Sequence, residues 1–140
     1  MTFCEFAMIN SDMRMVLAGT FTGITVTRPS DAAAPVEGFG TVALPPAFLV
    51  ATVNASISEG LTHAAELLVL NDDNGEVFSP IPLGDWTFVL NPHGRPMRYQ
   101  GLINVTGLAL PGPGEYTFRL RLGGQTVGEV PLYVDLAPGT

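Results

Sequence analysis

The chain has 140 residues, of which 46% are hydrophobic and only 14% are charged, compared with about 25% charged residues in a typical domain. Thirteen acidic and six basic residues give a net charge of −7, which argues against partners that need a basic patch, namely nucleic acid and anionic membrane surfaces. The length suits a single domain with its own core, and the low charge favours association with itself or with a protein partner.

The cysteine count and the first residues bear on where the protein works. A single cysteine, Cys4, excludes an internal disulfide. The opening residues, MTFCEFAMINSD, have neither the basic region nor the long apolar region of a signal peptide. No apolar run approaches about 18 residues, the length that a transmembrane helix needs. We therefore expect a cytoplasmic protein that does not insert into a membrane.

The first third of the chain predicts two strands and a long connection. Residues 2–10 are apolar on both faces, as in a covered strand. Residues 13–27 predict a second strand, with a bend or bulge near Gly19–Gly23. Residues 28–46 are rich in proline and glycine and predict an irregular connection, with a short edge strand at 40–44.

The middle of the chain predicts a series of strands separated by turns. Regular alternation of apolar and polar residues marks the clearest strand, and a continuous apolar run that ends at Leu70 marks a central one. Asn74-Gly75 is a hairpin signal. The predicted strands cover residues 48–59, 63–70, 76–79, 86–90 and 97–108.

The stretch LPGPGEYTFRLRLGGQTVGEVPLYV, residues 110–134, predicts two strands joined by a tight turn. The two Pro-Gly pairs, which end at Gly114, force a turn between sheets, because proline fixes its own φ and lacks an N–H. Gly123-Gly124 predicts a two-residue hairpin loop. Pro131 marks the last strand as an edge strand or a bulged one.

Alternate residues of these two strands predict much of the core. Tyr116 follows the turn at the position of a tyrosine corner, where its hydroxyl would bond to the backbone upstream. The polar residues between the core positions face water. The predicted core positions are Tyr116, Phe118, Leu120 and Leu122 on the first strand and Val130, Leu132 and Val134 on the second.

Eight or nine short strands at this spacing predict an all-β fold, an antiparallel immunoglobulin-like β-sandwich that spans residues 1–140 as one domain. Three stretches also carry a family resemblance: FCEFAMINSDMRMVLAGTF, FLVATVNASISEGLTHAAELLVLNDDNGE and PGPGEYTFRLRLGGQTVGEVPLYV. They resemble a bacterial domain family of unknown function with an immunoglobulin-like sandwich. The resemblance covers most of the chain, implies the fold and implies no catalytic residue. Residues 12–15, DMRM, stand where the family tends to have a glycine turn.

The loop NDDNG is the first candidate for binding chemistry. Asp72, Asp73 and Asn74 resemble part of a calcium loop, but Leu70 and Ile81 stand where an EF-hand needs carboxylates. The same residue types make good turns without metal. We favour a turn and keep a ligand-binding or calcium-binding loop as the alternative; Asp85 or Glu115 would then supply further carboxylates.

Catalytic and cofactor-binding patterns are not found in the sequence. His63 and His93 have no metal-ligand spacing, and no G-x-S-x-G nucleophile elbow is present. Cys4 lies in an apolar strand and has no basic neighbour to lower its pKa. We therefore expect no catalytic residue, no metal and no cofactor.

Aromatic residues offer two further interpretations. Trp86 with Tyr99 or Tyr133 could form a platform for a sugar, but a core position for Trp86 is favoured. Tyr133 should point outward with Glu129, because its neighbours on the strand face the core. The candidate interface residues are Tyr133, Glu129, Arg119 and Arg121.

Three functions follow from these observations. The favoured function is a non-enzymatic protein-interaction or assembly module that binds a protein partner or itself. The alternative is a β-sandwich that binds carbohydrate or a small ligand through aromatic residues at loop tips. An enzyme is the third hypothesis and would need His63 or His93 beside a carboxylate and a hydroxyl group.

Overall fold

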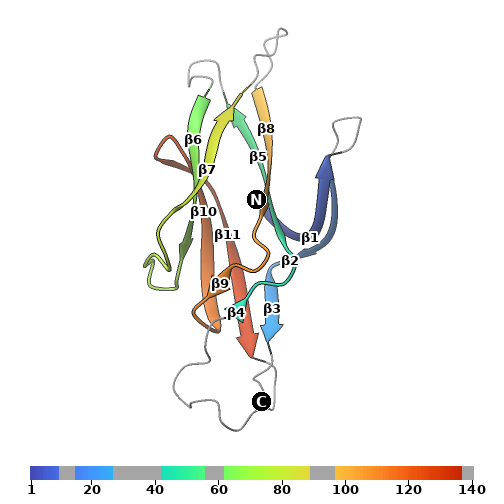
Figure 1. Ribbon diagram of the computed structural model, residues 1–140, viewed down its shortest axis with the longest axis vertical. Helices are drawn as coiled ribbons and strands as arrows, with labels where there is room; N and C mark the ends of the chain where they lie inside the picture. Colours follow the sequence, from blue (N-terminus) through green and yellow to red (C-terminus); the bar gives the residue numbers. More distant parts are fainter. Residues whose placement is uncertain (10–14, 27–41, 56–61, 89–96, 137–140) are drawn as a thin grey trace.

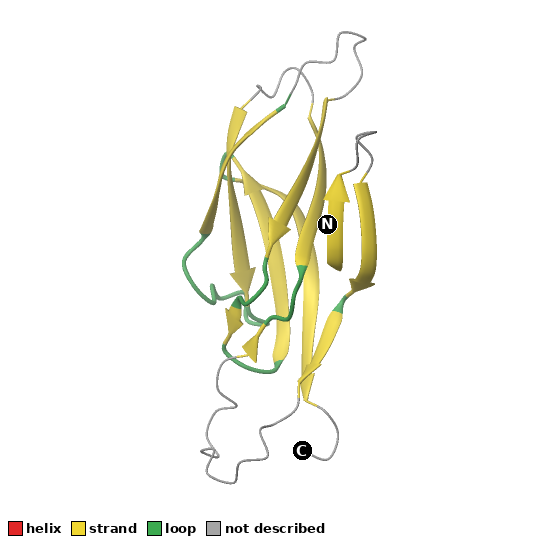
Figure 2. Cartoon of the chain, turned by 45° about the vertical axis from the view of Figure 1, so that its right-hand side comes forward, coloured by secondary structure: helices red, strands yellow, loops and turns green. Residues whose placement is uncertain are grey.

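A computed structural model describes residues 1–9, 15–26, 42–55, 62–88 and 97–136 (Figure 1). These residues contain strands and loops and no helix (Figure 2). The strands are β1 (Thr2–Ile9), β2 (Met15–Phe21), β3 (Gly23–Val26), β4 (Val42–Ala43), β5 (Phe48–Ala55), β6 (Thr62–Leu70), β7 (Ile81–Thr87), β8 (Met97–Asn104), β9 (Ala109–Leu110), β10 (Gly114–Leu122) and β11 (Gln125–Leu136).

The strands form three sheets. A four-stranded sheet has the order β2-β1-β5-β8, a five-stranded sheet has the order β3-β11-β10-β6-β7, and β4 pairs with β9. Side chains from all three sheets meet in one apolar core, including Leu49 of the four-stranded sheet, Leu132 of the five-stranded sheet and Leu110 of the small one. Burial of this shared core is the main stabilising term of such a fold.

The hairpin of β10 and β11 confirms the sequence interpretation most closely. Its loop is Gly123-Gly124, with φ values of 57° and 81°, the left-handed conformation that a two-residue hairpin requires and that glycine adopts without strain. Gly114 opens β10, directly after the predicted turn. All seven predicted core residues are buried, namely Tyr116, Phe118, Leu120, Leu122, Val130, Leu132 and Val134.

Pro131 lies in a part of β11 that has β10 on one side only. The strand β3 pairs with β11 from Tyr133 onward, and the Tyr133 N–H donates to the Thr22 carbonyl 2.9 Å away. Backbone groups repeat their direction every two residues, so the ring nitrogen of Pro131, which carries no hydrogen, faces the same side as the Tyr133 N–H. This side has no neighbouring strand at Pro131, because β3 begins only at the position paired with Tyr133. The prediction of an edge position is therefore confirmed for this part of the strand.

The chain changes sheet at Thr22, which confirms the bend predicted near Gly19–Gly23. The strand β2 ends at Phe21 in the four-stranded sheet, and β3 begins at Gly23 in the five-stranded sheet. Gly19 has a φ of 65°, which favours glycine. The strand β3 then runs parallel to β11, so the prediction of a purely antiparallel fold is wrong at this pair.

Several predicted strand boundaries are also wrong. Residues 76–79 form no strand; the chain returns past Leu70 through one isolated bridge to Glu76. The next strand, β7, begins at Ile81 rather than at residue 86, and β8 ends at Asn104 because a turn with Gly107 at φ 77° follows. The described residues contain eleven strands, including two of only two residues, instead of eight or nine.

Some predictions fall on residues outside the described ranges. The turn at 11–12 and most of the connection at 28–46 are among them. The described end of that connection contains β4, which pairs with β9 through Val42 and Leu110. The short edge strand expected at 40–44 is therefore present at Val42–Ala43.

Tyr116 ties the turn before β10 to the strand itself. Its hydroxyl donates a buried hydrogen bond to the carbonyl of Gly112, at 2.5 Å and four residues upstream. The predicted bond from this tyrosine to the upstream backbone is thereby confirmed. Burial raises the pKa of the Tyr116 phenol, and the negative charge of Asp72 adds to the rise. The phenol therefore stays protonated and can donate its hydrogen bond to the Gly112 carbonyl.

We expect Tyr116→Phe to lower the free energy of unfolding by about 1 kcal/mol at pH 7, because the buried Gly112 carbonyl loses its donor. The folded-state pKa lies above the unfolded value of about 10, so the neutral phenol contributes its full stability below pH 10 and loses it as pH rises further. The difference between wild type and variant should therefore shrink above pH 10 in urea unfolding curves. Tyr133→Phe removes an exposed hydroxyl and is the control; an equal loss in both variants would contradict the assignment.

Candidate functional site

Trp86 is part of the core and not a surface platform. Its side chain is 5% exposed, and its ring stacks on Tyr99 with centroids 4.6 Å apart and planes 23° from parallel. The indole also covers Gly101 of β8, so that it links the edges of the two large sheets. The core prediction for Trp86 is confirmed, and the sugar platform made of Trp86 and Tyr99 is wrong.

The loop NDDNG closes on itself. The Asn71 side-chain oxygen accepts the N–H groups of Asp73 at 3.0 Å and Gly75 at 2.8 Å. Asn74 has a φ of 60°, the left-handed conformation that Asn tolerates in turns. Asp72 and Asp73 are exposed. The predicted turn is confirmed. No group of three or more potential metal-ligating side chains occurs in the described parts of the chain.

The four candidate interface residues lie on adjacent strands, β10 and β11, and their side chains alternate with the buried ones. Tyr133 is 42% exposed, as predicted. The charged residues form cross-strand ion pairs: Arg119 binds Glu129 at 2.6 Å, and Arg121 binds Glu66 of β6. The structure thus places an exposed tyrosine on a sheet face whose neighbouring arginines already have acidic partners.

The remaining reactive side chains are dispersed. Cys4 is completely buried, as expected. His93 falls outside the described residues. His63 is half-buried at the start of β6, where its imidazole meets the Phe88 ring edge to face at a centroid distance of 5.9 Å.

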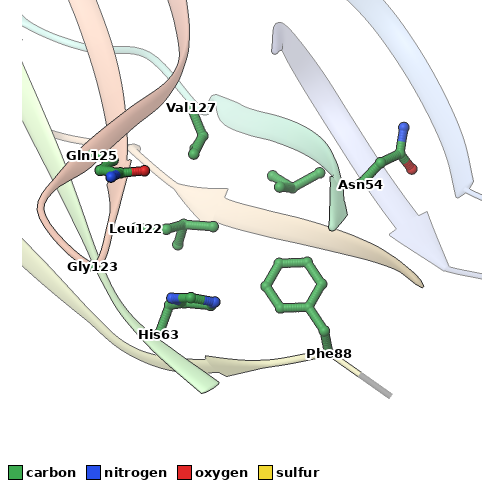
Figure 3. Close-up of a pocket in the computed structure, with 8 residues that line it drawn as sticks. Asn54, His63, Phe88, Leu122, Gly123, Gln125 and Val127 are labelled. Carbon is green, nitrogen blue, oxygen red and sulfur yellow. The ribbon is translucent and has the colours of Figure 1, made fainter. Parts of the chain in front are cut away.

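His63 lines a cavity of about 600 Å³ between the two large sheets (Figure 3). The cavity lies beside the hairpin loop of β10 and β11, next to the end of β5. Among the described residues, its lining contains Val53, Asn54, His63, Phe88, Leu122, Gly123, Gln125 and Val127. No described lining residue is a carboxylate, a hydroxyl or a thiol, so His63 has no neighbour in the lining for acid–base or nucleophilic chemistry.

The sequence did not reveal this cavity as a site. Val127 is an extra residue in β11, because Leu120 pairs with Gly128 while Arg121 pairs with Thr126. This bulge breaks the alternation and leaves the Val127 side chain 44% exposed. The only local signal was the loss of alternation in QTVGEV after the Gly-Gly turn.

Comparison with known families identifies the chain through a match over nearly all of its residues. The model of a family of unknown function, DUF6941, matches residues 1–135. The chain belongs to this family. No curated protein matches the sequence. Membership in DUF6941 agrees with the resemblance to a domain of unknown function and assigns no activity to the cavity or to the face around Tyr133.

No helix in the described part of the chain is long and apolar enough to cross a membrane.

We expect Gly101→Ala to destabilise the protein by about 2 kcal/mol, because the added methyl group would overlap the buried Trp86 indole. The single tryptophan provides the fluorescence signal for urea unfolding. Gly128→Ala is the matched control, since its methyl group would meet only the flexible Met1 side chain at 3.4 Å. Equal unfolding midpoints for the two variants would show that Trp86 does not pack against β8 as described.

Proposed function

We propose that this chain is a non-enzymatic protein-interaction module that self-associates through the face of β10 and β11 around Tyr133. The observation that carries the proposal is the 42% exposure of this tyrosine on a regular sheet face. Tyrosine supplies a large contact area with little loss of side-chain entropy, and it is enriched at protein interfaces.

The surroundings of Tyr133 support a flat contact. On β3, the position paired with Tyr133 is Gly23, which has no side chain to shield the ring. Pro131, two residues before Tyr133, is exposed and uncharged. A second copy approaching this face therefore meets an exposed ring that has short neighbours on β3 and at position 131 and has Glu115 opposite it on β10.

The arginines on the same face do not oppose association between identical copies. Arg119 and Arg121 each have an acidic partner on a neighbouring strand. Two further acidic residues, Asp135 and the Glu115 of β10 that pairs with Tyr133, are exposed on this face. Like charges on identical surfaces would repel each other, whereas balanced pairs do not. The overall charged content of 14% fits the same interpretation.

The absence of enzymatic activity is part of the proposal and rests on the lining of the large cavity. His63 is the one titratable side chain among the described lining residues. Catalysis by an imidazole needs a second group that holds it, receives its proton or attacks the substrate. The described lining supplies amides and apolar groups instead.

We also infer that the two large sheets form an immunoglobulin-like sandwich. The inference is supported by the shared core of the two sheets and by the Tyr116 hydroxyl bond to Gly112 at the start of β10. This bond has the position and geometry of the tyrosine corner that characterises such sandwiches.

We expect light scattering over a roughly tenfold concentration range to give a mass that rises from monomer to dimer. Tyr133→Glu should move the dissociation constant upward by at least about tenfold, because a buried charge at the centre of an interface has no partner. Leu102→Glu is the matched control: Leu102 is 38% exposed on β8 of the other large sheet. A monomer at every concentration, or an equal effect of both variants, would refute self-association through this face.

A further inference from the structure

We propose that the cavity beside the hairpin loop of β10 and β11 binds a neutral aromatic ring that carries one hydrogen-bonding group. The proposal is independent of the Tyr133 face, which lies toward the other end of β11. It rests on three features of the cavity: its position, the absence of charged side chains from the described part of its lining, and the chemistry of His63.

The cavity is a consequence of how the strands overlap. The strand β1 pairs with β5 only from Val50 to Phe48, so Val53 extends past the start of β1. On the opposite sheet, the bulge at Val127 shifts the start of β11 relative to β10. The space between these two parts measures about 600 Å³, within the range of roughly 300 to 1,000 Å³ that small-molecule sites occupy.

The lining selects against charged ligands. The described lining residues include neither Asp, Glu, Lys nor Arg. An ion that entered would lose hydration without gaining a partner of opposite charge, which is unfavourable. A phosphate, a carboxylate or a metal ion is therefore a poor occupant, and a neutral molecule is a good one.

The ring surfaces indicate an aromatic occupant. Phe88 and His63 meet at an interplanar angle of 76°, and the aliphatic side chains of Leu122, Val53 and Val127 complete the apolar part of the lining (Figure 3). Phe88 itself is only 1% exposed, so a further ring would pack against the half-buried His63 imidazole and the exposed Val127 side chain and would add the edge-to-face or stacked contact that aromatic groups favour.

His63 supplies the polar selectivity. Within the described ranges, its imidazole interacts with the Phe88 ring and has no hydrogen-bond partner. A neutral imidazole has one donor and one acceptor nitrogen, and a half-buried one benefits from a partner. The exposed Gln125 amide lies in the same lining. A phenol or an indole would pack its ring against Val53 and Val127 and present its O–H or N–H to these groups.

The first experiment titrates the isotopically labelled full chain by NMR with 4-methylphenol, toluene and 4-methylbenzoate. We expect saturable shifts of the amides of residues 122–127 with 4-methylphenol, with a dissociation constant of roughly 1 mM for so small a probe. Toluene should bind about fivefold more weakly because it lacks the hydroxyl. 4-Methylbenzoate should not saturate. Equal binding of all three, or no saturable shift with 4-methylphenol, would overturn the proposal.

Two variants connect the binding to the cavity. Val127→Trp places a large ring into the space from an already half-exposed position and should abolish saturable binding, while Leu102→Trp on the other sheet should leave it unchanged. His63→Phe keeps the ring surface and should erase the roughly fivefold preference for 4-methylphenol over toluene. Unfolding curves confirm that each variant is folded. Binding that survives in Val127→Trp would refute the site.

The same ring chemistry is found in free small molecules and in tyrosine or tryptophan side chains of a protein. N-acetyl-tyrosinamide distinguishes these sources. If it binds at least about tenfold more tightly than 4-methylphenol, peptide backbone contacts contribute and the ligand is a segment of a protein. If it binds more weakly, the cavity takes a free aromatic molecule. Both results support the aromatic site, and neither depends on dimerisation through Tyr133.

Discussion

The contact between Phe3 and Phe118 determines much of the rest of the structure. The two rings meet edge to face with centroids 4.9 Å apart, and they come from the four-stranded and the five-stranded sheet. Phe3 also stacks on Phe21, at 5.6 Å, which is the last residue before the chain crosses between the sheets. One buried aromatic cluster thus fixes where β1 lies over β10 and where β2 gives way to β3. Because β1 begins at Thr2, which pairs with Val50, the part of β5 that follows has no β1 residue beside it, and the cavity lies next to this part of β5.

The strand edges of the five-stranded sheet are poorly suited to pairing with another chain. One edge strand, β3, has only four residues. The part of β11 that lies beyond β3 contains the bulge at Val127 and Pro131, which has no N–H, and the other edge strand, β7, contains Pro82 and a left-handed Gly84 at φ 79°. Proline, bulges and strong local twist are devices that prevent sheets from joining edge to edge. The same devices direct any association toward a sheet face, which is where Tyr133 is exposed. The exposed ring and the blocked edges therefore favour the same mode of contact.

The sequence was informative where structure is local and uninformative where it depends on distant partners. The hairpin of β10 and β11 was predictable because a period of two, a Gly-Gly loop and a tyrosine after a Pro-Gly turn all act over a few residues. The strand β7 was missed at its start, since Pro82 and Gly84 are tolerated there only because β7 is an edge. The parallel pairing of β3 with β11 joins residues more than a hundred positions apart, and no local pattern specifies it.

The cavity was missed for the same reason. Its position depends on where the pairing of β1 with β5 stops and on a bulge in β11. The burial of Trp86 followed from its pattern, whereas its contact with Gly101 did not.

The ion pairs on the outer face affect association more than stability. The side chains of Arg119 and Glu129 are 30% and 45% exposed, and pairs of this kind contribute about 0 to 1 kcal/mol because water screens them.

The larger effect of these ion pairs is on the charge of the surface. The pairs link β11 to β10 and β10 to β6, so that two of the six basic residues of the chain are neutralised on one sheet. Pairing of these charges lowers the repulsion between copies, while the exposed Glu115 and Asp135 beside Tyr133 retain theirs. The protein as a whole carries a net charge of −7, so association through this face has to overcome the repulsion of the remaining acidic residues. The contact area of the Tyr133 ring is the part of this face that favours association.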